Sequence, residues 1–150
     1  MAAVATIGYQ LATVRTFIEA LNAGGVEVVA DVRAVASSRR PGFSKSRLAA
    51  NLEEAGIGYV HLRDLGTPAE GRAAARAGRH AELRRIYRRH LVTAAAREEL
   101  RRLADLVAAG PRVCLLCLEA DPTHCHRTLV ASALAEVIPV EVVHLHPAEE

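Results

Sequence analysis

Val113-Cys114-Leu115-Leu116-Cys117-Leu118 is the most continuous apolar run in this chain of 150 residues. A polar cluster follows it directly, and a helical pattern of apolar residues comes after that cluster. A short apolar run in this setting is typical of a strand buried on both faces of a parallel sheet. We therefore predict a strand over residues 112–118 and read the rest of the chain outward from it.

Further strand and helix patterns alternate on either side of this run. Strand patterns cover residues 4–9, 26–32, 57–62 and 140–145, and helical patterns cover residues 13–21, 44–55, 70–90, 93–108 and 122–137. Gly71 and Gly78 are weak points within the helical pattern of residues 70–90. Alternating strands and helices predict a mostly parallel sheet of about five strands with helices on both faces. The expected fold is a three-layer, Rossmann-like α/β domain over residues 1–150.

The composition bounds the class of protein. Hydrophobic residues make up 51% of the chain and charged residues 24%, which is typical of a globular protein. No apolar stretch approaches the roughly 20 residues that span a membrane, and no signal peptide is visible. Three cysteines are an odd number and no disulfide framework, so we expect a reduced, cytoplasmic setting. The net charge of +2 is too small to indicate nucleic-acid binding by itself.

The polar cluster after residue 118 is the strongest candidate site. Nine residues at a strand-to-helix junction contain two carboxylates, two imidazoles, a thiol and a guanidinium: Glu119, Asp121, His124, Cys125, His126 and Arg127. A helix beginning at Pro122 or Thr123 would present free backbone N–H groups that favour an anion. The Arg127 side chain would add a bidentate donor for phosphate or carboxylate.

Cys125 and His126 allow both a catalytic and a structural interpretation. A cysteine at a helix start has a lowered pKa and can act as a nucleophile, with a histidine as its base. On a helical wheel that includes residues 122–137, His126 lies on the apolar face and points toward the sheet. Cys125 lies roughly 120° away, toward the flank. His126 is then a packing histidine or a base, and Cys125 is a bystander or a nucleophile.

Two other segments carry charge at predicted strand ends. Asp31 and Arg33 point to the same face at the end of the second strand, either as a local ion pair or as part of a site. The loop of residues 39–45 places three cations on a Pro-Gly turn that feeds a helix, which suits an anion. Phe43 in that loop either anchors it on the core or stacks on a base. A second basic group, a solvated face or a nucleic-acid contact, consists of Arg72, Arg76, Arg79, Arg84, Arg85, Arg88 and Arg89.

Metal binding is the weaker interpretation of the cysteines and histidines. Cys114 and Cys117 have Cys-x2-Cys spacing, but alternation along a strand sends them to opposite faces, which argues against a zinc knuckle. His124, His126, Cys125 and Asp121 offer another set of ligands, with help from His61 or Glu119. We assign no metal and no cofactor from the sequence.

Five motifs in order resemble the family of the domain of unknown function 488. They are Thr6-Ile7-Gly8-Tyr9, Asp31-Val32-Arg33, Arg40-Pro41-Gly42-Phe43-Ser44, Tyr59-Val60-His61-Leu62 with Leu65-Gly66, and residues 115–127. The resemblance covers nearly the whole chain. It implies a prokaryotic α/β protein and a candidate site. It implies no activity, because the family carries no established reaction.

If the first and fourth strands are neighbours, these motifs form one crevice. We expect catalytic groups among Asp31, Glu119, Asp121, His124, Cys125 and His126. We expect anion or substrate contacts from Gly8, Tyr9, Arg33, Arg40, Phe43, Lys45, His61 and Arg127. The expected function is a hydrolase or group transferase acting on a phosphorylated, nucleotide-like or nucleic-acid substrate. The alternative is a non-catalytic module that binds nucleotide or nucleic acid; the sequence does not indicate an oligomeric state.

Overall fold

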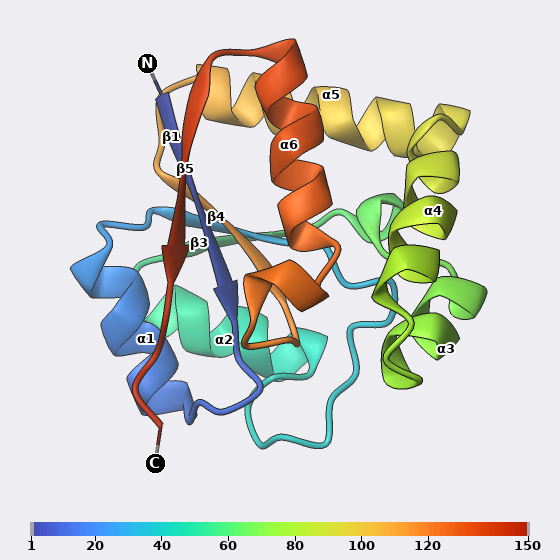
Figure 1. Ribbon diagram of the computed structural model, residues 1–150. Helices are drawn as coiled ribbons and strands as arrows, with labels where there is room; N and C mark the ends of the chain where they lie inside the picture. The colour runs from blue at the N-terminus through green and yellow to red at the C-terminus, as the bar shows by residue number, and fades with distance from the viewer. Residues whose placement is uncertain (1, 150) are drawn as a thin grey trace.

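The computed structural model describes residues 2–149 and alternates strands with helices (Figure 1). The strands are β1 (Ala2–Gly8), β2 (Val28–Asp31), β3 (Gly58–His61), β4 (Val113–Cys117) and β5 (Val140–Leu145). The helices are α1 (Val14–Ala23), α2 (Lys45–Glu54), α3 (Ala69–Arg76), α4 (His80–Leu91), α5 (Ala94–Ala108) and α6 (Arg127–Val137). Two short 3-10 turns, η1 (Arg63–Leu65) and η2 (Pro122–His124), precede α3 and α6.

The five strands form one parallel sheet in the order β3-β2-β4-β1-β5. Strand β4 lies at the centre, and its Val113 is in register with Val4 of β1 and Val28 of β2. Every residue of β4 is buried, as expected for the central strand of a covered sheet. The predicted parallel sheet of about five strands is confirmed, and the first and fourth strands are neighbours, which is the condition on which the expected crevice depends.

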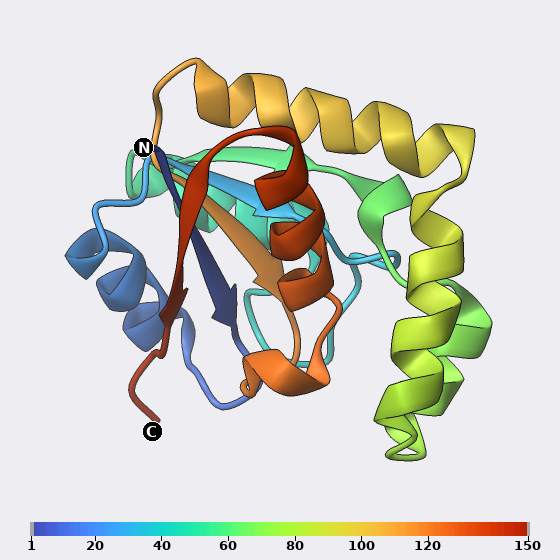
Figure 2. The same ribbon diagram turned by 45° about the horizontal axis from the view of Figure 1, so that its top comes forward.

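Helices cover both faces of the sheet, as Figures 1 and 2 show. On one face, Phe17 and Leu21 of α1 and Leu48 and Leu52 of α2 pack with the apolar side chains of β1, β2 and β4. On the other face, α5 and α6 supply Leu103, Val107, Val130 and Leu134, and Tyr87 of α4 joins the same cluster. This is the predicted three-layer, Rossmann-like arrangement.

Two predicted helices differ from the structure at their boundaries. The helical pattern of residues 70–90 is divided into α3 and α4 at Gly78, whose φ of +75° belongs to the left-handed region that glycine adopts without strain. The last helix does not begin at Pro122 or Thr123, so that prediction is wrong. The Asp121 side chain caps only the turn η2, Cys125 is extended, and α6 begins at Arg127.

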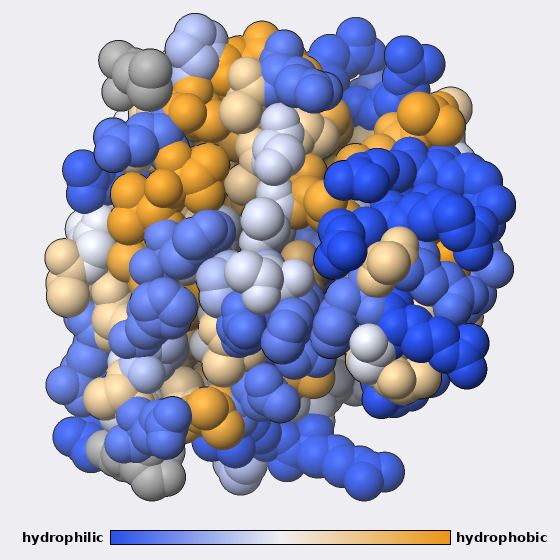
Figure 3. Space-filling view, in the orientation of Figure 1, coloured by the Kyte–Doolittle hydropathy of each residue, from blue (hydrophilic) through white to orange (hydrophobic). Residues whose placement is uncertain are grey.

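Hydrophilic and apolar side chains are unevenly distributed on the face shown in Figure 3. In Figure 3, hydrophilic side chains cover α3 and α4 on the right, and apolar ones lie over β5 and the turn before it. The large exposed hydrophobic residues there are Val137, Val142 and Val143. Within residues 2–149, no helix has the length and apolar character needed to cross a membrane.

Candidate functional site

A cavity of about 230 Å³ lies beyond the carboxyl ends of β1, β2 and β4. This is the edge at which ligands bind in open parallel sheets. The segments that follow β1, β2, β3 and β4 meet there, because parallel strands bring the loops that follow them to the same edge, and α3 and α4 add further residues. The cavity is lined by Tyr9, Arg33, Ala34, Val35, Ser37, Thr67, Arg72, Ala75, Arg76, Leu83, Cys117, Leu118, Glu119, His124, Cys125 and His126.

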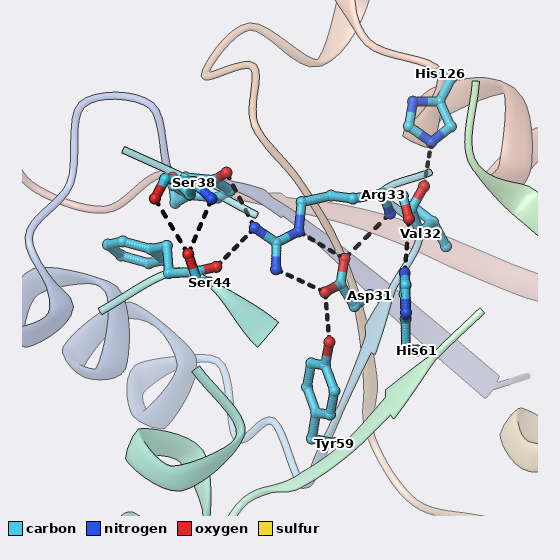
Figure 4. Close-up of polar contacts among 10 residues, drawn as sticks. Asp31, Val32, Arg33, Ser38, Ser44, Tyr59, His61 and His126 are labelled. Carbon is cyan, nitrogen blue, oxygen red and sulfur yellow. Dashed lines mark hydrogen bonds and ion pairs between the residues drawn. The ribbon is translucent and has the colours of Figure 1, made fainter. Parts of the chain in front are cut away.

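Arg33 lines the cavity and forms a buried ion pair with Asp31 at the end of β2 (Figure 4), whereas Asp31 itself is not among the lining residues. The Arg33 guanidinium donates from Nε to Oδ1 of Asp31 (2.9 Å) and from Nη2 to Oδ2 (2.8 Å). Its Nη1 donates to the Tyr9 hydroxyl (3.1 Å) and to the Phe43 carbonyl (2.7 Å). The Tyr59 hydroxyl donates to Oδ2 of Asp31 (2.6 Å). Asp31 and Arg33 therefore form the local ion pair that is one of the two predicted interpretations. Most N–H donors of the Arg33 guanidinium form hydrogen bonds within the protein.

This network shifts two ionisation equilibria. Burial alone lowers the pKa of Arg33, but the hydrogen bonds and negative charge of Asp31 outweigh it and leave the pKa raised. Burial raises the pKa of Tyr59, and the hydrogen bond to Asp31 raises it further. Both groups therefore keep their protons at neutral pH, so the network is a fixed frame for the cavity.

His126 lies at the floor of the cavity with a defined orientation. Its Nε2 is 2.6 Å from the Val32 carbonyl oxygen, as Figure 4 shows. A carbonyl oxygen only accepts, so Nε2 donates the hydrogen of this bond and Nδ1 lies on the other side of the ring. The Val32 backbone is itself fixed, because its N–H donates to the Leu116 carbonyl of β4 (3.1 Å). His126 points toward the sheet, as its place on the helical wheel predicts.

Two thiols face Nδ1 of His126. The Cys117 sulfur is 3.5 Å from Nδ1, and the Cys125 sulfur is 3.8 Å from it. Burial opposes ionisation of Cys125, yet hydrogen bonds with Cys117 and His126 hold the pKa of Cys125 well below its usual value. The Cys125 hydrogen bond raises the pKa of Cys117 instead, and burial adds to that shift. The Tyr87 ring packs against His126 at 5.1 Å between centroids and closes this side.

The structure corrects the predicted direction of Cys125. The helical wheel places this side chain on the flank of the last helix, but Cys125 lies before α6 in extended backbone (φ −128°, ψ 147°). Extended backbone turns the side chain inward, and only 6% of the residue is exposed. Cys125 is therefore neither a flank residue nor a surface thiol.

Arg127 and Gly8 hold the loop after β4 in place. The Arg127 side chain is fully buried and donates to the Thr6 hydroxyl (3.2 Å) and to the carbonyls of Glu119 and Ala120. A Cβ on Gly8 would stand 1.7 Å from the Glu119 carbonyl oxygen. The group that approaches the Gly8 backbone is thus this carbonyl, where the sequence predicts a ligand. Both residues have a structural role in this geometry, and neither lines the cavity.

The remaining polar groups of the cluster differ in exposure. Glu119 lines the cavity, and partial burial and the neighbouring Cys125 raise its pKa. His124 also lines the cavity, and its ring stacks on that of His80 at 4.1 Å. Asp121 is exposed, and its hydrogen bonds from Thr123 lower its pKa. Asp121 therefore shapes η2 and lies outside the cavity lining.

The loop of residues 39–45 supports the cavity from outside. Phe43 is fully buried and stacks on the Tyr9 ring at 4.4 Å, so it anchors the loop on the core. The Arg40 guanidinium donates to the Ala12 carbonyl. Lys45 is exposed at the start of α2. His61 Nε2 is 2.7 Å from the Arg33 carbonyl. None of these four side chains lines the cavity, and their predicted contacts with an anion stay untested.

Sequence reasoning missed three contributors to this site. The sequence predicts Cys117 only as an interior residue of a strand, but its sulfur lies 3.5 Å from Nδ1 of His126. Arg72 and Arg76 of α3 line the cavity, although the sequence assigns them only to a basic group that is either a solvated face or a nucleic-acid contact. The signal available for Arg72 and Arg76 was their i, i+4 spacing, which puts both on one helix face.

Comparison with known proteins identifies a family and nothing more specific. The model of the family described as "Domain of unknown function DUF488" matches residues 13–134. No curated protein matches the chain, and no solved structure does.

Proposed function

Because the chain belongs to the DUF488 family, whose description states no reaction, we propose a function from the strand-end cavity. The protein acts as an enzyme, a hydrolase or group transferase, on a small phosphorylated or nucleotide-like substrate. One observation carries the proposal: Glu119, His126 and two arginines of α3 line the same cavity. The two arginines are Arg72 and Arg76. No packing requirement accounts for that combination.

The two arginines of α3 favour an anionic substrate. Arg72 donates from Nη1 to the Thr67 carbonyl (2.9 Å), which holds the guanidinium at the cavity wall. Arg76 is exposed at the rim. Neither forms an ion pair with a carboxylate of residues 2–149. The cavity volume of about 230 Å³ lies just below the range of small-molecule pockets, roughly 300–1,000 Å³, so the cavity suits one phosphorylated unit better than a duplex.

Binding and turnover should separate in paired variants. Nucleoside monophosphates and inorganic phosphate are titrated by calorimetry at low salt, and phosphate release is followed with nucleotides and p-nitrophenyl phosphate. Replacing Arg72 and Arg76 by Met should weaken binding roughly 10-fold or more for each lost charged hydrogen bond. Glu119→Gln should keep binding and lower turnover roughly 100-fold or more. Arg101→Met, on the exposed surface of α5, is the matched control and should change neither quantity.

Two outcomes would overturn the proposal. An equal loss of affinity in Arg101→Met would mean that binding is a general effect of charge. Binding that depends on Arg72 and Arg76, without turnover of any member of the panel, would instead favour the non-catalytic binding module.

A further inference from the structure

Three soft donor atoms converge beside the cavity without an assigned purpose. The sulfurs of Cys117 and Cys125 and Nδ1 of His126 all lie within 4.8 Å of one another. With bond lengths of about 2.3 Å to sulfur and 2.0–2.1 Å to nitrogen, a tetrahedral zinc ion sets S···N edges at about 3.5 Å. The two observed S···N distances are 3.5 and 3.8 Å. The spacing of the donors therefore matches two edges of a zinc tetrahedron.

The histidine has the orientation that a metal ligand needs. Histidines that bind metals usually donate their second ring N–H to a carboxylate or a backbone carbonyl, which fixes the ring and its tautomer. The Val32 carbonyl plays this part for Nε2 of His126 at 2.6 Å. Nδ1 then faces the two sulfurs.

The donors come from a rigid frame. Cys117 ends the central strand and is in register with Gly8 of β1. Cys125 and His126 belong to the loop that the buried Arg127 ties to the sheet through Thr6 and the Glu119 carbonyl. Zinc affinity is greatest where ligands are held before the metal arrives, and this loop is held by hydrogen bonds that do not involve the donors.

We propose that Cys117, Cys125 and His126 bind one zinc ion whose fourth position opens into the strand-end cavity. Two thiolates and one imidazole are a donor set that zinc accepts readily. Structural zinc sites use four protein ligands, whereas three protein ligands with an open position are typical of catalytic sites. All three donors line the cavity, which gives a water or substrate atom access to the ion.

The role of the fourth position rests on the proposed function, while zinc binding itself does not. A water on the ion loses one proton to Glu119, and its oxygen forms the new bond to the electrophilic atom of the substrate. The bond to the leaving group breaks, and Glu119 returns the proton to that group. Of the two proposed reaction classes, this site therefore favours hydrolysis.

The test uses the full chain, stripped of metal with a chelator and titrated with zinc against a chromophoric competitor. We expect one zinc ion per chain and, after replacement by cobalt(II), the near-ultraviolet charge-transfer absorption of thiolate ligands. Cys117→Ala, Cys125→Ala and His126→Ala should each lower zinc affinity about 100-fold or more. Cys114→Ala is the matched control, because Cys114 is a buried cysteine of the same strand on the opposite face. It should keep zinc.

A second measurement uses the unaltered protein, so the test does not depend on whether the variants fold. In the unaltered protein, zinc should protect Cys117 and Cys125 from alkylation under partly denaturing conditions and leave Cys114 unprotected, as located by mass spectrometry. No zinc binding at micromolar concentration, a cobalt spectrum without thiolate bands, or equal loss of zinc in Cys114→Ala would each overturn the site. If phosphorylated compounds bind but zinc does not, only this inference fails; if zinc binds and no phosphorylated compound does, only the proposed function fails.

Discussion

The buried Asp31–Arg33 pair should be the largest electrostatic contributor to the stability of the cavity wall. The Asp31 carboxylate is fully buried and accepts hydrogen bonds from the Arg33 backbone N–H, from Nε and Nη2 of Arg33, and from the Tyr59 hydroxyl. The Arg33 side chain is only 5% exposed. Neither charge can recover its hydration if the partner is removed.

Asp31→Asn keeps the shape of the side chain and removes its charge. The Arg33 guanidinium is then buried without a counter-charge, and an amide NH2 replaces one acceptor that faces two donors. Breaking a buried pair in this way costs about 3–5 kcal/mol. A domain of this size is stable by roughly 5–15 kcal/mol. With a urea slope of about 2 kcal/mol per M, the unfolding midpoint should fall by about 1.5–2.5 M.

Urea unfolding followed by circular dichroism at pH 7 measures this change. Glu98→Gln is the matched control, since the Arg101–Glu98 pair has a similar contact of 2.8 Å with side chains that are 71% and 59% exposed. Exposed pairs contribute about 0.2–1 kcal/mol. Adding Arg33→Met to Asp31→Asn removes the orphaned charge and should restore part of the stability. A cost below about 1 kcal/mol for Asp31→Asn, or no recovery in the double variant, would refute this reasoning.

Two further predictions concern the loop after β4 and the alkaline limit of stability. Gly8→Ala places a Cβ 1.7 Å from the Glu119 carbonyl oxygen. It should therefore lower the free energy of unfolding, measured by thermal unfolding, by about 1–3 kcal/mol and weaken zinc binding. Gly58→Ala is the control, because its Cβ meets its nearest atom at 3.4 Å, and it should have neither effect. Burial and Asp31 raise the pKa of Tyr59 in the folded state above its unfolded value of about 10, so this stabilisation is complete below pH 10 and declines above it. Tyr59→Phe should flatten that decline between pH 10 and 12 in urea titrations; an unchanged slope would contradict the assignment.

The fold was predictable because each element carries its own local signal. The fully buried β4 appears in the sequence as an unbroken apolar run, and the capping box of α1 appears as Thr13 followed by Thr16. The break between α3 and α4 falls at Gly78, where the sequence has a weak point. The strand order was not readable in the same way, since placing β4 between β2 and β1 depends on how crossovers pack.

The candidate site was harder to predict, because it depends on where regular backbone stops. The helical wheel is valid for His126, whose backbone is helical (φ −64°, ψ −18°), and fails one residue earlier. Cys125 has extended backbone, so the helical wheel does not predict the direction of its side chain, which contacts that of His126. The donors of Arg127 likewise go to the backbone carbonyls of an irregular loop, which no periodic pattern foretells.

The strand parity that excludes a zinc knuckle also determines the metal site proposed above. Alternation along β4 separates Cys114 from Cys117, and Cys114 packs with the α1 and α2 side of the sheet. Cys117 must then face the other side, where the chain returns eight residues later with Cys125 and His126. The two cysteines of the Cys-x2-Cys motif therefore cannot bind one metal ion together. Cys117, however, lies on the same face of the sheet as Cys125 and His126. The alternation of side chains along β4, more than the spacing of its cysteines, determines which thiol can bind the metal ion.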